Sequence, residues 1–108
     1  MTKLIFFLLL SSFSFSQEYF VYIASESDDT VSLIKFDGKN TTEIERIPVG
    51  IKFSEIEGPH GITIDPSGDY WYLSLAHGNP YGSLTKFSTE TNKAIAKTEL
   101  GIFPATCL

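Results

Sequence analysis

Apolar and polar residues alternate in short runs along the chain from residue 19 onward, and helical periodicity is nearly absent there. Successive side chains of a strand point to opposite faces of a sheet, so an alternation with a period of two predicts β-strands. Gly, Pro, Asn and Asp bound the runs, as is typical of turns between strands. The expected strands span residues 19–24, 30–36, 43–49, 61–65, 70–75, 83–87 and 94–100.

The sequence predicts a tight turn most clearly between residues 65 and 69. Pro66 suits the second position of a tight turn because its φ is already fixed, and Gly68 supplies a positive φ. A hairpin is therefore expected here, with Asp65 facing Tyr70.

The order of the runs repeats within the chain. Four short strands about every 40 to 50 residues are the sequence pattern of propeller blades. The matched segments are Tyr22-Ile23-Ala24-Ser25 with Tyr72-Leu73-Ser74-Leu75, Val31-Ser32-Leu33-Ile34-Lys35-Phe36 with Gly82-Ser83-Leu84-Thr85-Lys86-Phe87, and Pro59 with Pro104. The sequence therefore predicts an all-β fold that is a fragment of a β-propeller, with about two four-stranded antiparallel blades.

This repeat resembles the YVTN-type β-propeller repeat, which is common in exported and surface-layer proteins. The resemblance covers residues 19–108 and rests on Thr30-Val31-Ser32-Leu33-Ile34, Ile47-Pro48-Val49-Gly50, Pro59-His60-Gly61-Ile62 and Asp65-Pro66-Ser67-Gly68. It implies a larger, seven-bladed ring in which residues 17–57 form strands B, C and D of a first blade, 58–101 a second blade and 102–108 the start of a third. Each blade buries its faces only against its neighbours, so further blades of the same chain are expected.

The first sixteen residues have the pattern of a cleavable secretory signal peptide. Lys3 supplies the positive charge, residues 4–10 the apolar region, and Ser14-Phe15-Ser16 a small-x-small cleavage site. About seven apolar residues are too few for a bilayer core, which needs about 20. We therefore expect cleavage after Ser16 and a secreted or periplasmic protein that does not span the membrane.

The remaining chain is acidic and has one thiol. Without Lys3, seven basic side chains face thirteen acidic ones, a net charge of −6. An acidic chain without a Lys/Arg cluster repels phosphates, so no nucleic acid is expected as a partner. Cys107 is the only cysteine, so no internal disulfide is expected, and it is interpreted as a small buried side chain on a strand.

The two histidines of the chain, His60 and His77, bracket the predicted inner hairpin of the second blade. With Asp65 facing Tyr70, His60 lies opposite about Leu75 and His77 follows two positions later. Both imidazoles are thus expected at one loop-bearing end, and loops on a rigid scaffold often carry function. We expect an unidentified small molecule or protein to bind there through His60, His77, Asn79 and Tyr81.

The same histidines also suggest a metal site. Two imidazoles with open positions suit copper, zinc or iron. The Gly-Pro-His element is similar to segments of nitrous-oxide reductase propellers, in which such a histidine ligates a copper cluster, and haem-d1 nitrite-reductase propellers are a second relative of this shape. These similarities imply His60 and His77 as metal ligands, with copper or haem as cofactor. Against this, the loop from Ser25 to Asp29 carries no histidine, and Ala105 stands where the third blade would need one.

Two functions from different classes are therefore expected. A binding or scaffold module without a cofactor is favoured, because the chain has no nucleophile elbow, no Gly-rich phosphate loop and no Cys-x-x-Cys-His segment. The alternative is the propeller domain of a periplasmic copper- or haem-dependent redox enzyme. In a third interpretation the histidines have no binding or catalytic role: His60 forms hydrogen bonds with backbone groups, and His77 is a solvent-exposed turn residue.

Overall fold

Seven β-strands and no helix make up the part of the chain that the computed structural model describes, residues 16–107. The bounds of the strands are β1 Tyr19–Ser25, β2 Thr30–Phe36, β3 Thr41–Pro48, β4 Pro59–Ile64, β5 Tyr70–Leu75, β6 Ser83–Ser88 and β7 Ala94–Glu99. All seven predicted strands are confirmed to within two residues at their ends. The predicted signal peptide lies outside the described residues, except for Ser16.

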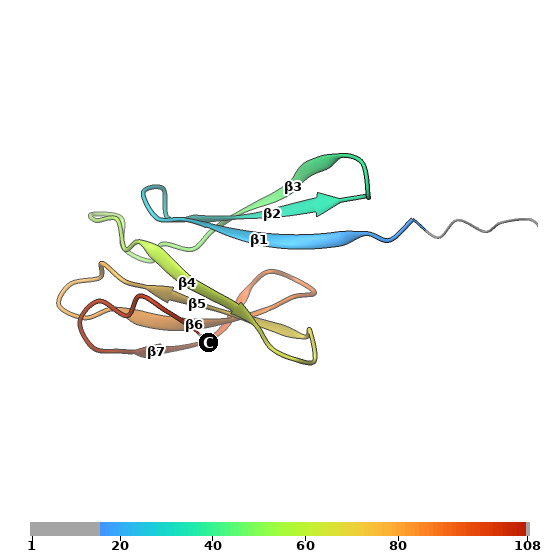
Figure 1. The fold of residues 1–108 in the computed structure, drawn as a ribbon. Helices are drawn as coiled ribbons and strands as arrows, with labels where there is room; N and C mark the ends of the chain where they lie inside the picture. The colour runs from blue at the N-terminus through green and yellow to red at the C-terminus, as the bar shows by residue number, and fades with distance from the viewer. Residues whose placement is uncertain (1–15, 108) are drawn as a thin grey trace, which may run out of the picture.

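The strands form two antiparallel sheets that face each other (Figure 1). Sheet A has the order β1-β2-β3, and sheet B has the order β4-β5-β6-β7. Within each sheet, every strand pairs with the next along the chain, so both sheets are simple meanders. The fold is therefore all-β, as the alternation predicted.

The hairpin predicted between β4 and β5 is confirmed. The amide of Gly68 donates to the carbonyl of Asp65 at 2.9 Å, and Gly68 has a φ of 77°. The amide of Asp65 donates to the carbonyl of Tyr70 at 3.0 Å. Toward its other end the β4–β5 pairing shifts register, so Pro59, and not His60, lies opposite Leu75. The prediction for His60 was wrong by one position because sequence counting does not see such a bulge.

The facing sides of the two sheets bury one apolar core. Its central residue is Trp71, which is fully buried and stacks on Phe87 with ring centroids 3.9 Å apart. Trp71 also stacks on Tyr22 of sheet A at 4.8 Å. Full burial of one large apolar side chain contributes about 1.5–3 kcal/mol. The core residues are Val31, Leu33, Ile47, Val49, Trp71, Leu73, Leu75 and Phe87.

A buried amide joins the two sheets at the edge of this core. Asn92, in the turn between β6 and β7, accepts hydrogen bonds from the Tyr22 hydroxyl at 2.8 Å and from the Trp71 indole at 3.3 Å. Its own amide nitrogen donates to Glu45 of β3 at 2.6 Å. Burial, and then the Glu45 carboxylate, raise the pKa of Tyr22 above its usual 10.0, which keeps the hydroxyl a donor.

Candidate functional site

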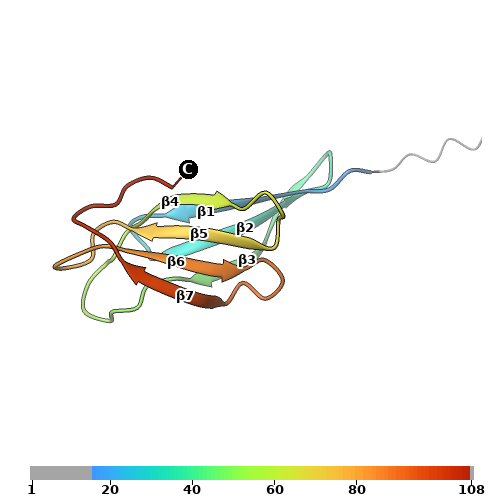
Figure 2. The same cartoon turned by 90° about the horizontal axis from the view of Figure 1, so that it is seen from below.

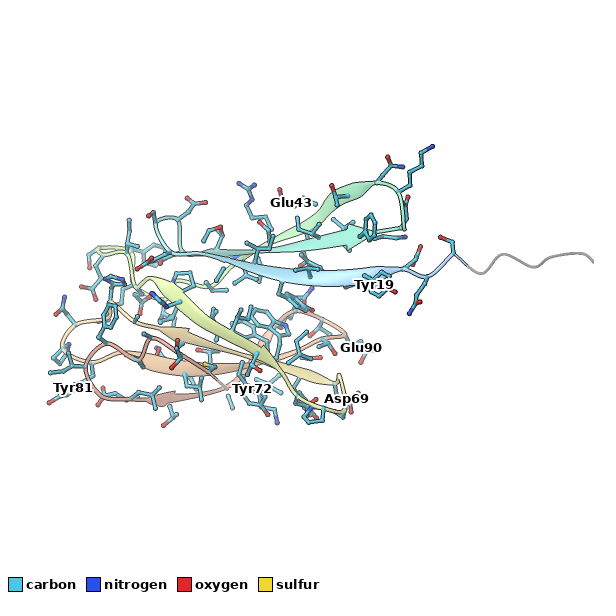
Figure 3. The ribbon with its side chains drawn as sticks, in the orientation of Figure 1. Tyr19, Glu43, Asp69, Tyr72, Tyr81 and Glu90 are labelled. Carbon is cyan, nitrogen blue, oxygen red and sulfur yellow. The ribbon has the colours of Figure 1, made fainter. Side chains whose placement is uncertain are left out.

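Four segments gather at one end of the two sheets. They are the β1–β2 turn, the β3–β4 loop, the β5–β6 loop and the tail that follows β7. Tyr81 of the β5–β6 loop lies at this end, whereas Asp69 and Glu90 mark the turns at the opposite end (Figure 3). We refer to the first as the loop end.

Asp29 fixes the β3–β4 loop at the loop end. Its φ is 46°, a left-handed conformation that Asp adopts more readily than most residues. Its carboxylate accepts hydrogen bonds from the amides of Glu57 at 3.0 Å and Gly58 at 2.9 Å. The buried carboxylate of Glu57 in turn accepts from the amides of Ile51 and Lys52. Two carboxylates thus satisfy the backbone donors of a loop that has no sheet partner.

The imidazoles of His60 and His77 converge on Glu26 of the β1–β2 turn. The Nε2 atom of His77 lies 2.5 Å from Oε1 of Glu26, and the Nε2 atom of His60 lies 4.0 Å from the same oxygen. The prediction that both histidines lie at one end is confirmed. Because Gly58 has a φ of 65° and a Cβ there would lie 2.1 Å from His77 Cδ2, the His77 ring requires glycine at position 58.

The tail after β7 covers the same histidines. The carbonyl of Ala105 accepts a hydrogen bond from Nδ1 of His60 at 2.8 Å, so this nitrogen carries the proton. The ring of Phe103 meets both imidazoles edge-on, with centroids 5.7 Å from His60 and 5.2 Å from His77. Phe103 has a φ of 54°, an unusual conformation for a large side chain. Glu26, His60, His77 and Phe103 therefore form one cluster, called the histidine cluster below.

Two nitrogens and one carboxylate oxygen are suitable donors for copper or zinc. Within residues 16–107, however, no three His, Cys, Asp or Glu side chains are arranged to hold a metal ion. Oε1 of Glu26 is at hydrogen-bonding distance from one imidazole and too far from the other. The metal site at His60 and His77 therefore stays a prediction, and we derive no metal chemistry from this arrangement.

The other two predicted site residues lie in the β5–β6 loop with His77. The carbonyl of Asn79 accepts a hydrogen bond from Nζ of Lys52 at 2.5 Å, and its amide donates to Glu55. Lys52 and Glu55 are themselves paired at 2.7 Å, and this hydrogen bond lowers the pKa of Glu55. Tyr81 is about half exposed, at 48%. No described contact joins the side chain of Asn79 or Tyr81 to either imidazole.

Sequence reasoning missed Glu26 and Phe103. The β1–β2 turn was examined only for histidine, although a carboxylate facing two histidines is an ordinary partner for them. Phe103 carried no signal, since its contact with the imidazoles depends on the path of the tail. Cys107 is half-buried and lies in the tail, outside any strand, so its interpretation as a buried strand residue was wrong. Its Sγ lies 3.5 Å from the carbonyl of Gly61.

No protein-family model matches this sequence, and no curated protein matches it at a significant level. Within residues 16–107, no helix is long and apolar enough to cross a membrane. Fold and site together define an all-β protein with two facing meander sheets and a histidine cluster at one end.

Proposed function

We propose that this chain is an exported β-repeat module of the propeller type whose loop end binds a ligand. One observation carries the proposal: side chains from two separate connections, from the start of β4 and from the tail converge there in the histidine cluster. The exposed fractions of the side chains are 37% for His60, 43% for His77 and 49% for Glu26, so all three are within reach of a partner. Binding groups placed on loops and held by a rigid sheet scaffold are typical of ligand sites.

The chemistry of the cluster indicates a polar ligand. The Glu26 carboxylate accepts hydrogen bonds, and the imidazoles donate or accept depending on their tautomer. The Phe103 ring, about half exposed, adds apolar surface beside them. An amide- or amine-bearing small molecule, or a loop of another protein, offers the matching groups.

Site-specific photo-crosslinking tests the proposal. A benzophenone amino acid replaces Tyr81 at the loop end, and the matched control replaces Lys39 in the exposed β2–β3 turn at the opposite end. We expect a defined adduct from position 81 that disappears when Glu26→Gln and His77→Ala are added, and none from position 39. Equal labelling from both positions, or none from position 81, would contradict loop-end binding.

Two further measurements separate this proposal from the others. Equilibrium dialysis with Cu²⁺ and Zn²⁺ tests the redox alternative. Stoichiometric metal binding by the wild type that is lost in His60→Ala and His77→Ala would favour a metal centre over the proposed ligand site. Mass spectrometry of the N-terminus after expression of the full gene tests export, for which a mature chain that begins at Gln17 is expected.

A further inference from the structure

The outer face of sheet A, turned away from sheet B, is apolar. Tyr22 and Ala24 of β1 pack on the core, so Val21 and Ile23 point outward, and each is 49% exposed. Ile34 of β2 pairs with Val21 on this face. An exposed row of β-branched residues on a sheet marks a surface that another layer covers.

The outer face of sheet B is also open. Trp71 and Leu73 point to the core, so Tyr72 points outward, next to Leu84 and Lys86 of β6. Tyr72 and Leu84 line a hollow of about 630 Å³ that the tail borders with Thr106 and Cys107.

The internal repeat relates these two outer faces to the interface between the sheets. Tyr72 and Leu84 of the outer face of sheet B correspond to Tyr22 and Leu33, which form the face of sheet A that receives sheet B. Conversely, Ile23 on the outer face of sheet A corresponds to Leu73, which sheet B buries against sheet A. The two open faces are therefore of the same two kinds as the pair that already packs together inside the chain.

Sheet A also lacks one strand that sheet B has. β4 pairs with β5, but no strand in the described chain pairs with the corresponding edge of β1. β4 itself lies against β1, and the tail lies against β4, where a Cβ at Gly61 would come within 2.6 Å of the Cys107 amide nitrogen. Figure 2 shows the tail returning beside β4. The tail therefore lies beside β4 of sheet B in the same way that β4 lies beside β1 of sheet A.

We propose that copies of this chain stack head to tail, with the outer face of sheet B on the outer face of sheet A of the next copy. The contact continues the internal sheet A–sheet B interface, and residues 103–107 of one copy become the fourth strand beside β1 of the next. Such a contact joins different surfaces on the two copies, so it builds chains or closes into a ring. Covering the open β1 edge also removes a site of uncontrolled strand pairing.

The repeat specifies the register of this contact. Pro104 corresponds to Pro59, so Cys107 corresponds to Ile62, which pairs with Leu73. Leu73 in turn corresponds to Ile23. Cys107 of one copy is therefore expected opposite Ile23 of the next.

Mixing two variants tests the stacking. The protein is expressed from the full gene, and its mass is measured by sedimentation over a wide concentration range. Ile23→Glu disrupts only the outer face of sheet A, and Leu84→Glu disrupts only that of sheet B. Both changes introduce the same charge, so the two disrupted faces also repel each other in a mixture. The association constant of each variant alone should fall by about tenfold or more, because either change puts a charge into the contact. An equal mixture should form heterodimers that grow no further, since one good face remains on each copy.

The same experiment has clear contrary outcomes. A wild-type chain that stays monomeric at every concentration, as expected if further blades of the same chain cover the two faces, would overturn the proposal. Loss of association in only one of the two variants would indicate a symmetric contact between like faces, and would overturn it as well. Trp71 emission reports whether each variant retains its core.

A disulfide test checks the register and does not depend on charged variants. Ile23→Cys is incubated with oxidised glutathione, which takes up the two electrons and two protons released when two thiols join. We expect an intermolecular bond between positions 23 and 107, identified as a linked peptide. Ile44→Cys on β3, equally exposed in the wild type at 49%, is the control and should not link to position 107. Equal linkage of positions 23 and 44 to Cys107, or no linkage of position 23, would overturn the proposed register.

Discussion

The amide oxygen of Asn92 lies 2.8 Å from the Tyr22 hydroxyl, and through this hydrogen bond the β6–β7 turn of sheet B holds β1 of sheet A. Asn92 combines this contact with a φ of 53° and near-complete burial. We predict that Asn92→Ala lowers the free energy of unfolding by about 1–3 kcal/mol, because the Tyr22 and Trp71 donors lose their acceptor.

Tyr22→Phe and Asn92→Gly separate the causes of this loss. The first removes one hydrogen bond and should cost about 1 kcal/mol, whereas the second relieves the backbone strain that alanine adds and should be milder than Asn92→Ala. Urea unfolding followed by the emission of Trp71, the only tryptophan, measures all three. Wild-type stability in Asn92→Ala would show that this amide does not hold the sheets together.

Thr85 of β6 has a buried hydroxyl without a hydrogen-bond partner among the described residues. A buried polar group that is left unpaired costs about 1–3 kcal/mol. Thr85→Val keeps the shape of the side chain and removes this group, so we predict a more stable protein by about 1 kcal/mol. The same change at Thr63 should leave the unfolding midpoint nearly unchanged. A destabilised Thr85→Val would mean that the hydroxyl has a partner such as bound water.

Asp29 is predicted to be the most sensitive position of the loop end. Asp29→Ala removes the acceptor of two backbone amides and places alanine at a positive φ. We expect a loss of about 1–3 kcal/mol. Asn keeps one acceptor oxygen and tolerates this φ, so Asp29→Asn should retain about half of that stability. Hydrogen exchange at the amides of Glu57 and Gly58 measures the effect locally, and unchanged protection in Asp29→Ala would contradict it.

Gly58 and Gly68 form a matched pair for testing the histidine cluster. Both have a positive φ, of 65° and 77°, but only at Gly58 would a Cβ collide with the His77 ring. Both alanine variants should lose about 1 kcal/mol to backbone strain. Only Gly58→Ala should also shift the imidazole NMR signals of His77, as the ring leaves Glu26. Identical His77 spectra in the two variants would show that the cluster does not depend on this close approach.

The period-two alternation was enough to predict the strands because each strand buries one face against the other sheet. Val31 and Leu33 are core residues separated by Ser32, and Trp71 and Leu73 are separated by Tyr72. Local turn chemistry was also readable, since Pro66 and Gly68 determine their own φ angles. These features depend on neighbours in sequence.

Only half of the histidine cluster was predictable, because its other half depends on residues that are far apart in the sequence. His60 and His77 follow from the hairpin that joins their strands, whereas Glu26 and Phe103 reach them from segments far away in the sequence. The bulge in β4 also changed the partner of Leu75 without a local signal, because glycine at position 61 is compatible with a regular strand as well. Contacts that depend on how two sheets are placed do not appear in alternation patterns.

Asp65 gives the pH dependence with the clearest cause. The Ser67 hydroxyl donates to its carboxylate at 2.7 Å, and this hydrogen bond, followed by backbone amides, holds the pKa of Asp65 below its ordinary value of 3.8. A lowered pKa in the folded state stabilises the fold above the unfolded value of 3.8, and this contribution is lost as the pH falls through the folded pKa. Ser67→Ala removes the main cause. We therefore predict that the NMR titration midpoint of Asp65 rises toward 3.8 in this variant and that stability changes less steeply with pH below that value. Thr98→Ala, which removes an exposed hydroxyl remote from this turn, should leave the midpoint in place; an unchanged midpoint in Ser67→Ala would show that the backbone amides alone lower the pKa.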